Sequence, residues 1–288
     1  MYWIVTDSAT DLPKSYIDAQ EQFQVLPITI TLEGQTLVPD GTDEYARNIY
    51  AQLRAGKVVT TAQINSETWK ENYEALLKNG QDVLSIVFSS GLSGTCQAAM
   101  LAAQELREKY PERQLVVIDS LCASMGEGLL VHHALQNRAA GMSLEDNAAW
   151  VRDNVQHLAH WFTVDDLMFL LRGGRVSAAS AYLGTMMRIK PILNVDEEGH
   201  LIPREKVQGR KRSIHHLLDK MKEHVVDPEN QVIFISHGDC ADEANHLAEL
   251  VRETFHPKEI LVGYIGPVIG AHAGPGTVAL FFLADQRD

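Results

Sequence analysis

An apolar strand, a loop of small polar residues and a helix follow one another near the middle of the chain, and this succession constrains the fold most. Residues 83–87 form an apolar run that is typical of a strand buried on both faces. Residues 96–109 contain neither Gly nor Pro and have apolar residues at helical spacing. The loop between them, residues 88–95, therefore leads into a helix start, where unpaired backbone N–H groups can bind an anion.

The composition of this loop favours a small ligand, and we interpret it as a carboxylate site. Gly91 and Gly94 permit close approach of the backbone to a ligand. The hydroxyl-bearing residues of the loop are Ser89, Ser90, Ser93 and Thr95. The alternative is that Ser93 merely caps the helix. The loop lacks the lysine of a phosphate-binding P-loop and does not match the dinucleotide fingerprint.

Strand and helix patterns alternate on both sides of this loop. Strands are expected at residues 1–5, 25–32 and 114–119, and helices at residues 43–54, 67–78 and 120–140. This alternation predicts an α/β fold with a mostly parallel sheet flanked by helices. Ligands of such sheets gather at the carboxyl ends of the strands. The polar turn at Asp7 follows one strand, and we favour a capping role for it over ligand or metal binding.

A polar segment at residues 60–66 precedes the helix at 67–78 and offers a second wall for the anion site. By spacing, Ser66 is expected to cap the helix and Thr61 to be a loop residue.

The sequence changes character near residues 157–160, and we place a domain boundary there. The N-terminal domain is expected to span residues 1–158 and the C-terminal domain residues 159–288. Helices at 209–225 and 240–255 alternate with strands at 231–236 and 259–264 in the second part. Residues 178–189 predict a helix rich in Ala, Leu and Met. Its Met186 and Met187 suit an adaptable pocket, although Met is also common as core filling.

A segment rich in Gly and Pro, residues 265–277, surrounds His272. Its composition predicts an unusual backbone path before a final strand at 278–283. A single His among small residues is a candidate for function, and the alternative is that it only bonds its own loop.

Charge and composition exclude several classes of function. The net charge is −13, which disfavours nucleic acid as a partner. Nine basic and four acidic residues between Leu170 and Arg212 form a basic island of net charge +5. Such an island suits a phosphorylated ligand or an acidic protein surface, or it is simply a solvated face.

No segment is long and apolar enough for a membrane span, and no signal peptide is evident. The three cysteines are scattered and predict neither a metal site nor disulfides. We therefore expect a cytoplasmic protein without a metal or other cofactor, which makes at most transient contact with a membrane.

Segments from end to end resemble the DegV family of bacterial lipid-binding proteins. They are residues 6–13, 61–63, 88–95, 164–167, 172–175, 189–193, 237–239 and 266–276. The resemblance implies two α/β domains with a long-chain fatty acid bound at their interface. It also implies that the protein is not itself an enzyme. In some bacteria such a protein is the binding subunit of a fatty acid kinase, which supplies phospholipid metabolism. It presents the carboxylate to a separate ATP-dependent subunit that makes an acyl phosphate.

The resemblance assigns roles to individual residues. The carboxylate-binding residues fall on Thr61, Ser93, Gly94 and His272. The residues facing the kinase fall on Arg172, Arg175 and Arg210. We place the acyl chain in a tunnel lined by Leu170, Met186, Met187 and Ile189. Many relatives carry proline where this chain has Ile64, so the path of that loop is open.

A second hypothesis is a hydrolase or acyltransferase in which Ser93 is the nucleophile and His272 the base. It lacks an evident carboxylate to orient His272.

Overall fold

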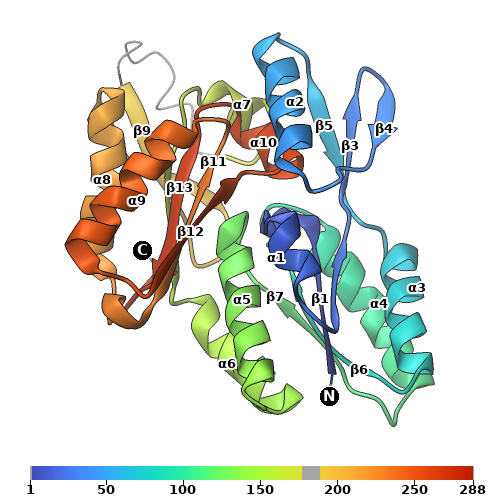
Figure 1. Cartoon of the computed structure of the whole chain (residues 1–288). Coiled ribbons are helices and arrows are strands. Elements are labelled where there is room, and N and C mark those ends of the chain that lie inside the picture. Colours follow the sequence, from blue (N-terminus) through green and yellow to red (C-terminus); the bar gives the residue numbers. More distant parts are fainter. Residues whose placement is uncertain (1, 177–188, 288) are drawn as a thin grey trace.

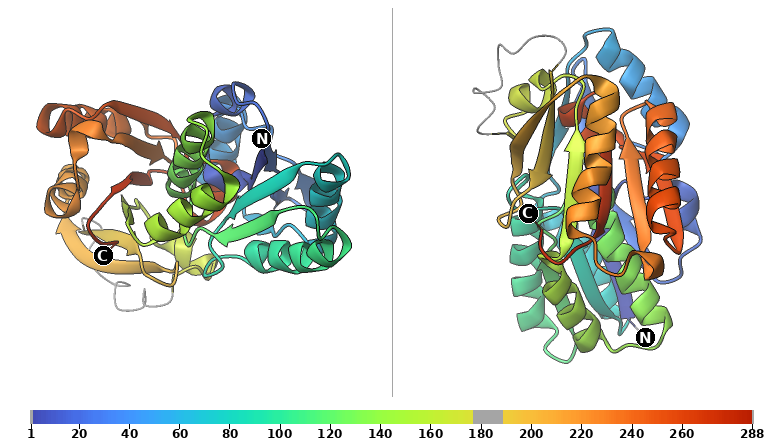
Figure 2. Two further views of the ribbon diagram at one scale, coloured as in Figure 1. Left: turned by 90° about the horizontal axis from the view of Figure 1, so that it is seen from below. Right: turned by 90° about the vertical axis from the view of Figure 1, so that its left-hand side faces the viewer.

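The computed structural model describes residues 2–176 and 189–287, and the chain packs as five alternating layers of helices and sheets (Figures 1 and 2). Two helices cover the outer face of the first sheet, two more lie between the sheets, and another two cover the outer face of the second sheet. The predicted helix at 178–189, with Met186 and Met187, lies outside the described residues except for Ile189. No helix in the described ranges is both long and apolar enough to cross a membrane.

The first sheet is wholly parallel and confirms the predicted fold class. Its strand order is β2-β1-β6-β7. The strands are β1 (Tyr2–Asp7), β2 (Phe23–Leu26), β6 (Asp82–Val87) and β7 (Leu115–Asp119). The helices on its two faces are α3 (Ser66–Lys78) and α4 (Thr95–Lys109) on one side, and α5 (Met125–Ala139) and α6 (Leu144–Val155) on the other. The two central strands, β1 and β6, are almost fully buried because helices cover both faces.

A small antiparallel sheet of order β4-β3-β5 stands above the first sheet, where only one strand was predicted. Its strands are β3 (Thr29–Leu32), β4 (Gln35–Leu37) and β5 (Val59–Ala62). The predicted strand at 25–32 is divided between β2 and β3 around Pro27, which has no N–H for a sheet ladder. Helix α2 (Asp43–Arg54) has its predicted bounds and, with β5, packs against α10 (Pro267–Ala273).

The second sheet has the order β10-β9-β8-β13-β11-β12 and is mostly antiparallel, because only β11 and β12 run parallel. Its strands are β8 (Leu158–Thr163), β9 (Ile189–Val195), β10 (Leu201–Gln208), β11 (Val232–His237), β12 (Glu259–Tyr264) and β13 (Val278–Leu283). Helices α8 (Arg210–His224) and α9 (Ala241–Phe255) cover its outer face, and α5 lies on its inner face. The predicted boundary coincides with the first residue of β8, but the domain limits stay a prediction.

The remaining elements are short. They are η1 (Ser8–Thr10), α1 (Lys14–Asp18), α7 (Met168–Arg172) and η3 (Pro228–Asn230). In the Gly- and Pro-rich segment, Pro267 opens α10 at the first turn, a position where its missing N–H costs nothing. The unusual path predicted there is thus a short helix that carries His272 towards β5.

Arg287 ties the two sheets together from the C-terminal end of the chain. Its side chain is buried, and its acceptors among the described residues are uncharged groups. These acceptors are the backbone carbonyls of Leu121, Val155, Leu158 and Asp196 and the Sγ of Cys122, at 2.8–3.3 Å. The first two carbonyls and the cysteine belong to the N-terminal part, and the others to the second sheet and its turn. A single side chain therefore satisfies backbone groups from both halves.

Candidate functional site

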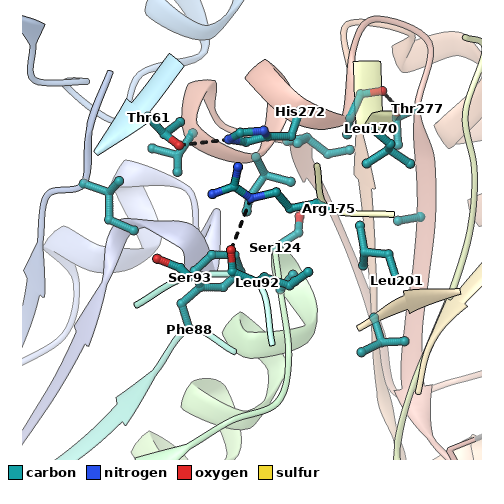
Figure 3. A pocket seen from close by; sticks show the side chains of 18 of the residues that line it. Thr61, Phe88, Leu92, Ser93, Ser124, Leu170, Arg175, Leu201, His272 and Thr277 are labelled. Carbon is teal, nitrogen blue, oxygen red and sulfur yellow. Dashed lines mark hydrogen bonds between the residues drawn. The ribbon is translucent and has the colours of Figure 1, made fainter. Parts of the chain in front are cut away.

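Thr61 and His272 are hydrogen-bonded although 211 residues separate them. The distance between Thr61 Oγ1 and His272 Nε2 is 2.8 Å (Figure 3). Thr61 lies in β5, not in a loop as predicted, and Asn65 rather than Ser66 caps α3. The pair forms because α10 packs on β5. Two residues of the predicted carboxylate site are therefore in direct contact.

Ser93 lies in the turn before α4, where Gly94 is the N-cap residue and provides no side-chain cap. Ser93 Oγ accepts a hydrogen bond from the N–H of Thr95 at 3.2 Å and lies 2.9 Å from Thr95 Oγ1. When the Thr95 hydroxyl donates to Ser93, the Ser93 proton is left for another acceptor. Gly94 rather than Ser93 is the N-cap residue of α4, but the Ser93 hydroxyl does accept from the N–H of Thr95, the first residue of that helix, so the alternative capping role is observed in part.

The side chain of Gln63, which follows β5, lies directly over Gly94. A Cβ atom at Gly94 would approach Gln63 Oε1 to 2.1 Å unless the Gln63 side chain moved. The segment after β5 thus lies against the loop that carries Ser93. Thr61 and Ser93 line the same cavity.

Other residues of the predicted anion loop serve the fold instead. Ser89 is buried and donates to the carbonyl of Gly199 at 2.9 Å. Gly91 lies against the backbone of Glu198, since a Cβ there would come within 2.8 Å of the Glu198 oxygen. These contacts hold the turn between β9 and β10 against the loop of residues 88–95.

A mostly apolar cavity of about 230 Å³ lies between the two sheets and beneath α10 (Figure 3). Thr61, Ser93, Gly94 and His272 all line it. Its apolar wall includes Phe88, Leu92, Phe162, Leu170, Leu201, Val268, Ile269 and Phe281. Of the predicted tunnel residues, Leu170 lines this cavity. Ile189 starts β9 and is not among the described residues that line it.

Arg175 belongs to the wall of this cavity, a position that sequence reasoning missed. Its Nε donates to the carbonyl of Leu92 at 3.2 Å, and it also donates to the carbonyl of Gly173. Its guanidinium lies between the Thr61–His272 pair and the Ser93 loop (Figure 3). The basic island was the available signal, but it did not show which arginine turns inward.

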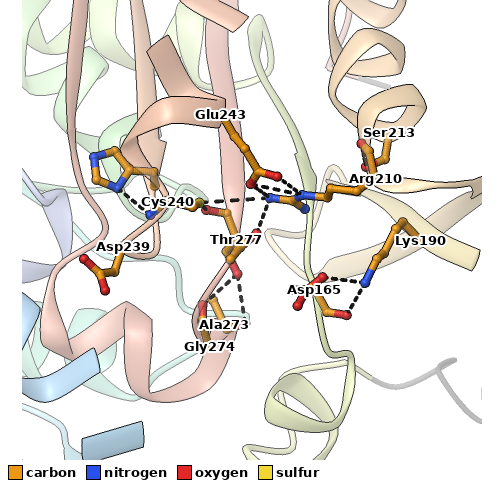
Figure 4. A network of polar contacts seen from close by, with 12 residues as sticks. Asp165, Lys190, Arg210, Ser213, Asp239, Cys240, Glu243, Ala273, Gly274 and Thr277 are labelled. Carbon is orange, nitrogen blue, oxygen red and sulfur yellow. Dashed lines mark hydrogen bonds and ion pairs between the residues drawn. The ribbon is translucent and has the colours of Figure 1, made fainter. Parts of the chain in front are cut away.

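The two other predicted docking arginines differ in their surroundings. Arg172 is exposed, and its guanidinium lies 6.0 Å from the ring centre of Phe169. Arg210 is bound to Glu243 at 2.6 Å and to the carbonyl of Gly276 (Figure 4). The guanidinium of Arg210 is thus held within the C-terminal half, and a docking role for any of the three stays a prediction.

Asp7 has the capping role that the sequence favoured. Its carboxylate accepts hydrogen bonds from the N–H groups of Ala9 and Phe88, at 2.9 and 3.0 Å. Burial raises its pKa to about 6 despite these bonds. Asp11 is also buried and accepts a hydrogen bond from Ser124 at 2.6 Å, and burial raises its pKa to about 7. Both carboxyl groups thus hold turns together.

His272 is neutral at physiological pH. Burial lowers its pKa to about 4, and the nearby guanidinium of Arg175 lowers it further in the same direction. A neutral imidazole donates from one nitrogen only. Its observed partner is Thr61, not Ser93, and the charged neighbour is a cation rather than a carboxylate. The described geometry therefore does not favour a Ser93–His272 nucleophile–base pair.

The low pKa of His272 predicts a specific dependence of stability on pH. An unfolded histidine takes up its proton near pH 6.5, whereas folded His272 does so near pH 4. The stability that this difference provides is complete above pH 6.5 and is lost as the pH falls towards 4, by about 1.4 kcal/mol per pH unit. The His272→Gln side chain binds no proton. When the pH falls from 7 to 5, we therefore expect the free energy of unfolding of this variant to fall by about 2 kcal/mol less than that of the wild type. Urea unfolding at both pH values measures this, and equal losses would contradict it.

Thr61, Ser93, Arg175 and His272 thus lie together in the wall of a mostly apolar cavity between two α/β layers. The chain matches the family model described as the uncharacterised DegV family over residues 2–285. It therefore belongs to the DegV family, which confirms the resemblance found in the sequence. A DegV domain-containing protein of Clostridium perfringens is 40% identical over 286 residues, covering 99% of this chain and 98% of that protein.

Solved structures of relatives share the fold. A DegV family protein from Thermus thermophilus, described by its fatty acid binding, has a TM-score of 0.87 at 30% identity, covering 98% of this chain and 99% of that one. DegV from Bacillus subtilis, described as a fatty acid binding protein, has a TM-score of 0.84 at 26% identity, covering 99% of both chains. Relatives that share this fold are thus described as binding fatty acids.

Proposed function

We propose that this protein binds one long-chain fatty acid, with the carboxylate at Thr61, Ser93 and His272 and the acyl chain in the apolar cavity. The observation that carries the proposal is the Thr61–His272 hydrogen bond in the wall of that cavity. Fatty acid binding by the relatives from Thermus thermophilus and Bacillus subtilis supports it.

The hydrogen bonds of the site suit an anionic acceptor. With the proton of the neutral imidazole on Nε2, His272 donates to Thr61, and the Thr61 hydroxyl proton is free for a carboxylate oxygen. The Ser93 hydroxyl and the backbone at Gly94 supply further donors. Arg175 adds a positive charge, which offsets the cost of removing the carboxylate from water.

The cavity wall supplies the driving force for binding. A buried methylene contributes about 0.8 kcal/mol, so the 14 methylenes of palmitate would contribute on the order of 11 kcal/mol. A carboxylate without partners would cost several kcal/mol of this. Hydroxyl groups at the end of an apolar cavity are therefore the arrangement that a fatty acid requires.

We further propose that the bound carboxylate is presented to a separate ATP-dependent kinase subunit, which forms the acyl phosphate. The protein itself then needs no catalytic residue, metal or cofactor. Exposed basic residues around the head site, Arg172 foremost, would face that partner. The basic island on an otherwise acidic chain supports this role, because an acidic partner surface would be attracted there and repelled elsewhere.

Native mass spectrometry of the purified protein tests ligand binding directly. We expect a mass increase equal to one fatty acid per chain, and reappearance of that complex when palmitate is added to delipidated protein. Absence of bound lipid together with no uptake of palmitate would refute the proposal. For the kinase step, the partner subunit and ATP should yield an acyl phosphate that hydroxylamine traps as a hydroxamate, and only when this protein is present.

A further inference from the structure

His160 is a polar residue in the wall of the mostly apolar cavity, and the proposed carboxylate site does not use it. It lies in the middle of β8, whose side chains point alternately to the two faces of the second sheet. Leu158 and Phe162, two residues to either side, pack in the core that includes α5, so His160 points to the same inner face. His160 is only 2% exposed and lines the cavity. A buried imidazole therefore interrupts the apolar wall.

Along the sheet, His160 lies away from α10 and its His272. The neighbouring strand β13 begins beside α10, where the Thr277 hydroxyl donates to the carbonyl of Ala273 at 2.9 Å. From there Thr277, Ala279 and Phe281 all line the cavity. His160 pairs with Phe281 in the sheet, and their ring centres are 5.3 Å apart with the rings edge to face. Two steps of about 7 Å along β13 therefore separate Thr277 from the position opposite His160.

One nitrogen of this imidazole has a partner and the other has none. His160 Nδ1 lies 3.1 Å from the carbonyl oxygen of Leu158, which can only accept, so Nδ1 carries the proton. Burial lowers the pKa of His160 well below its usual range, and the positive charge of Arg287 acts in the same direction, so the ring is neutral at physiological pH. Nε2 is therefore a hydrogen-bond acceptor. It has no partner among the described residues.

The groups around Nε2 cannot supply a donor. Nε2 lies directly against the backbone of Gly126 in the first turn of α5, where a Cβ would clash with it. The N–H of Gly126 donates to the carbonyl of Ala123 at 3.1 Å. The Ser124 hydroxyl donates to Asp11 at 2.6 Å. Because Ala123 and Ser124 line the cavity together with His160, a donor for Nε2 has to come from a molecule inside the cavity.

We infer that the cavity selects a fatty acid with a hydroxyl group on the distal part of its acyl chain, and that this hydroxyl donates to His160 Nε2. The inference rests on the proposed function, because it takes the carboxylate to lie at Thr61 and the chain to lie in the cavity. An unsubstituted chain would cover Nε2 with methylene groups and leave a buried acceptor unpaired, which disfavours binding. A keto group would also leave it unpaired, because a carbonyl oxygen is itself an acceptor. The protonation of the imidazole thus favours a hydroxy acid over both.

Calorimetric titration of the delipidated wild-type protein with stearate, a series of hydroxystearates and the matching ketostearates tests this selection. We expect the hydroxystearate that binds most tightly to carry its hydroxyl on the distal part of the chain, and to bind about tenfold more tightly than stearate. The ketostearate with its oxygen on the same carbon should bind more weakly than that hydroxystearate by a similar factor. A hydroxyl group next to the carboxylate should bring no gain.

Variants of His160 separate the hydrogen bond from the shape of the cavity. His160→Phe keeps a planar ring without the acceptor, so the hydroxystearate should lose its advantage over stearate. His160→Gln keeps an acceptor oxygen and should retain part of that advantage. His246→Phe, at an exposed position on α9, is the matched control and should change neither affinity. Circular dichroism verifies that each variant is folded, and the ligand series on the wild type tests the inference independently of them.

Equal affinities of the wild type for stearate and for every hydroxystearate would overturn the inference, because water would then satisfy Nε2. A folded His160→Phe variant that still prefers the hydroxy acid would overturn it as well. Failure of the wild type to bind any of these acids would instead refute the proposed function, so the two failures are distinguishable.

Discussion

Replacing Ser93 with Ala is expected to weaken palmitate binding by about 10- to 150-fold, the range for loss of a hydrogen bond to a charged group. The Ser93 hydroxyl lies in the wall of the cavity and is fixed by the N–H and the hydroxyl of Thr95. Its removal leaves a carboxylate oxygen with one donor fewer in a partly enclosed site. Competition against a fluorescent fatty acid measures the change.

Ser90→Ala is the matched control because it makes the same substitution in the same loop at an exposed position. It should leave palmitate affinity unchanged. Equal affinities of Ser93→Ala and the wild type would exclude Ser93 from the head site.

A double-mutant cycle of Thr61→Val and His272→Gln extends this test. In the proposed site His272 donates to Thr61 and Thr61 donates to the ligand, so the two substitutions should be clearly non-additive. Additive losses would mean that each residue contacts the ligand independently.

Arg287→Met is expected to lower the free energy of unfolding by about 3 kcal/mol or more. The substitution keeps an unbranched, flexible side chain but takes this donor away from four carbonyl groups, two of them in buried contacts, and each buried loss costs about 1–3 kcal/mol. Urea unfolding followed by circular dichroism measures the effect. Arg152→Met, at an exposed position on α6, should leave stability within about 0.5 kcal/mol of the wild type.

A loss of less than 1 kcal/mol in Arg287→Met would contradict the role assigned to this side chain. Arg287 joins carbonyls from both halves. We therefore also expect the unfolding transitions of the two halves, when each is followed separately, to coincide less closely in the variant than in the wild type. Trp69 in α3 and Trp161 in β8 are buried reporters, one in each half.

The sequence predicted the local units well because each depends on contiguous residues. The strand, loop and helix around Ser93 span fewer than thirty residues, and their apolar spacing reflects burial directly. Asp7 was likewise interpreted correctly, because a carboxylate after a strand commonly bonds nearby N–H groups. The roles of Ser93 and its neighbours in ligand binding stay predictions.

Local patterns were not sufficient where packing between distant segments decides the outcome. The second half shows the same alternation of helices and strands, yet its sheet is mostly antiparallel. Whether strands run parallel or antiparallel depends on which strands become neighbours in the sheet. Local sequence patterns do not show which strands these are. Thr61 was expected in a loop because its segment is polar, but pairing with β3 makes that segment a strand.

By itself, the sequence determined that this protein is α/β, with a first parallel sheet and a turn of small polar residues before a central helix. Periodicity and turn chemistry act within a few residues, so they can be read without coordinates. Only the tertiary structure decided that His272 meets Thr61 across 211 residues and that Arg175 turns into the cavity wall. Those contacts arise because α10 packs on β5, and packing of one buried surface on another depends on the whole chain.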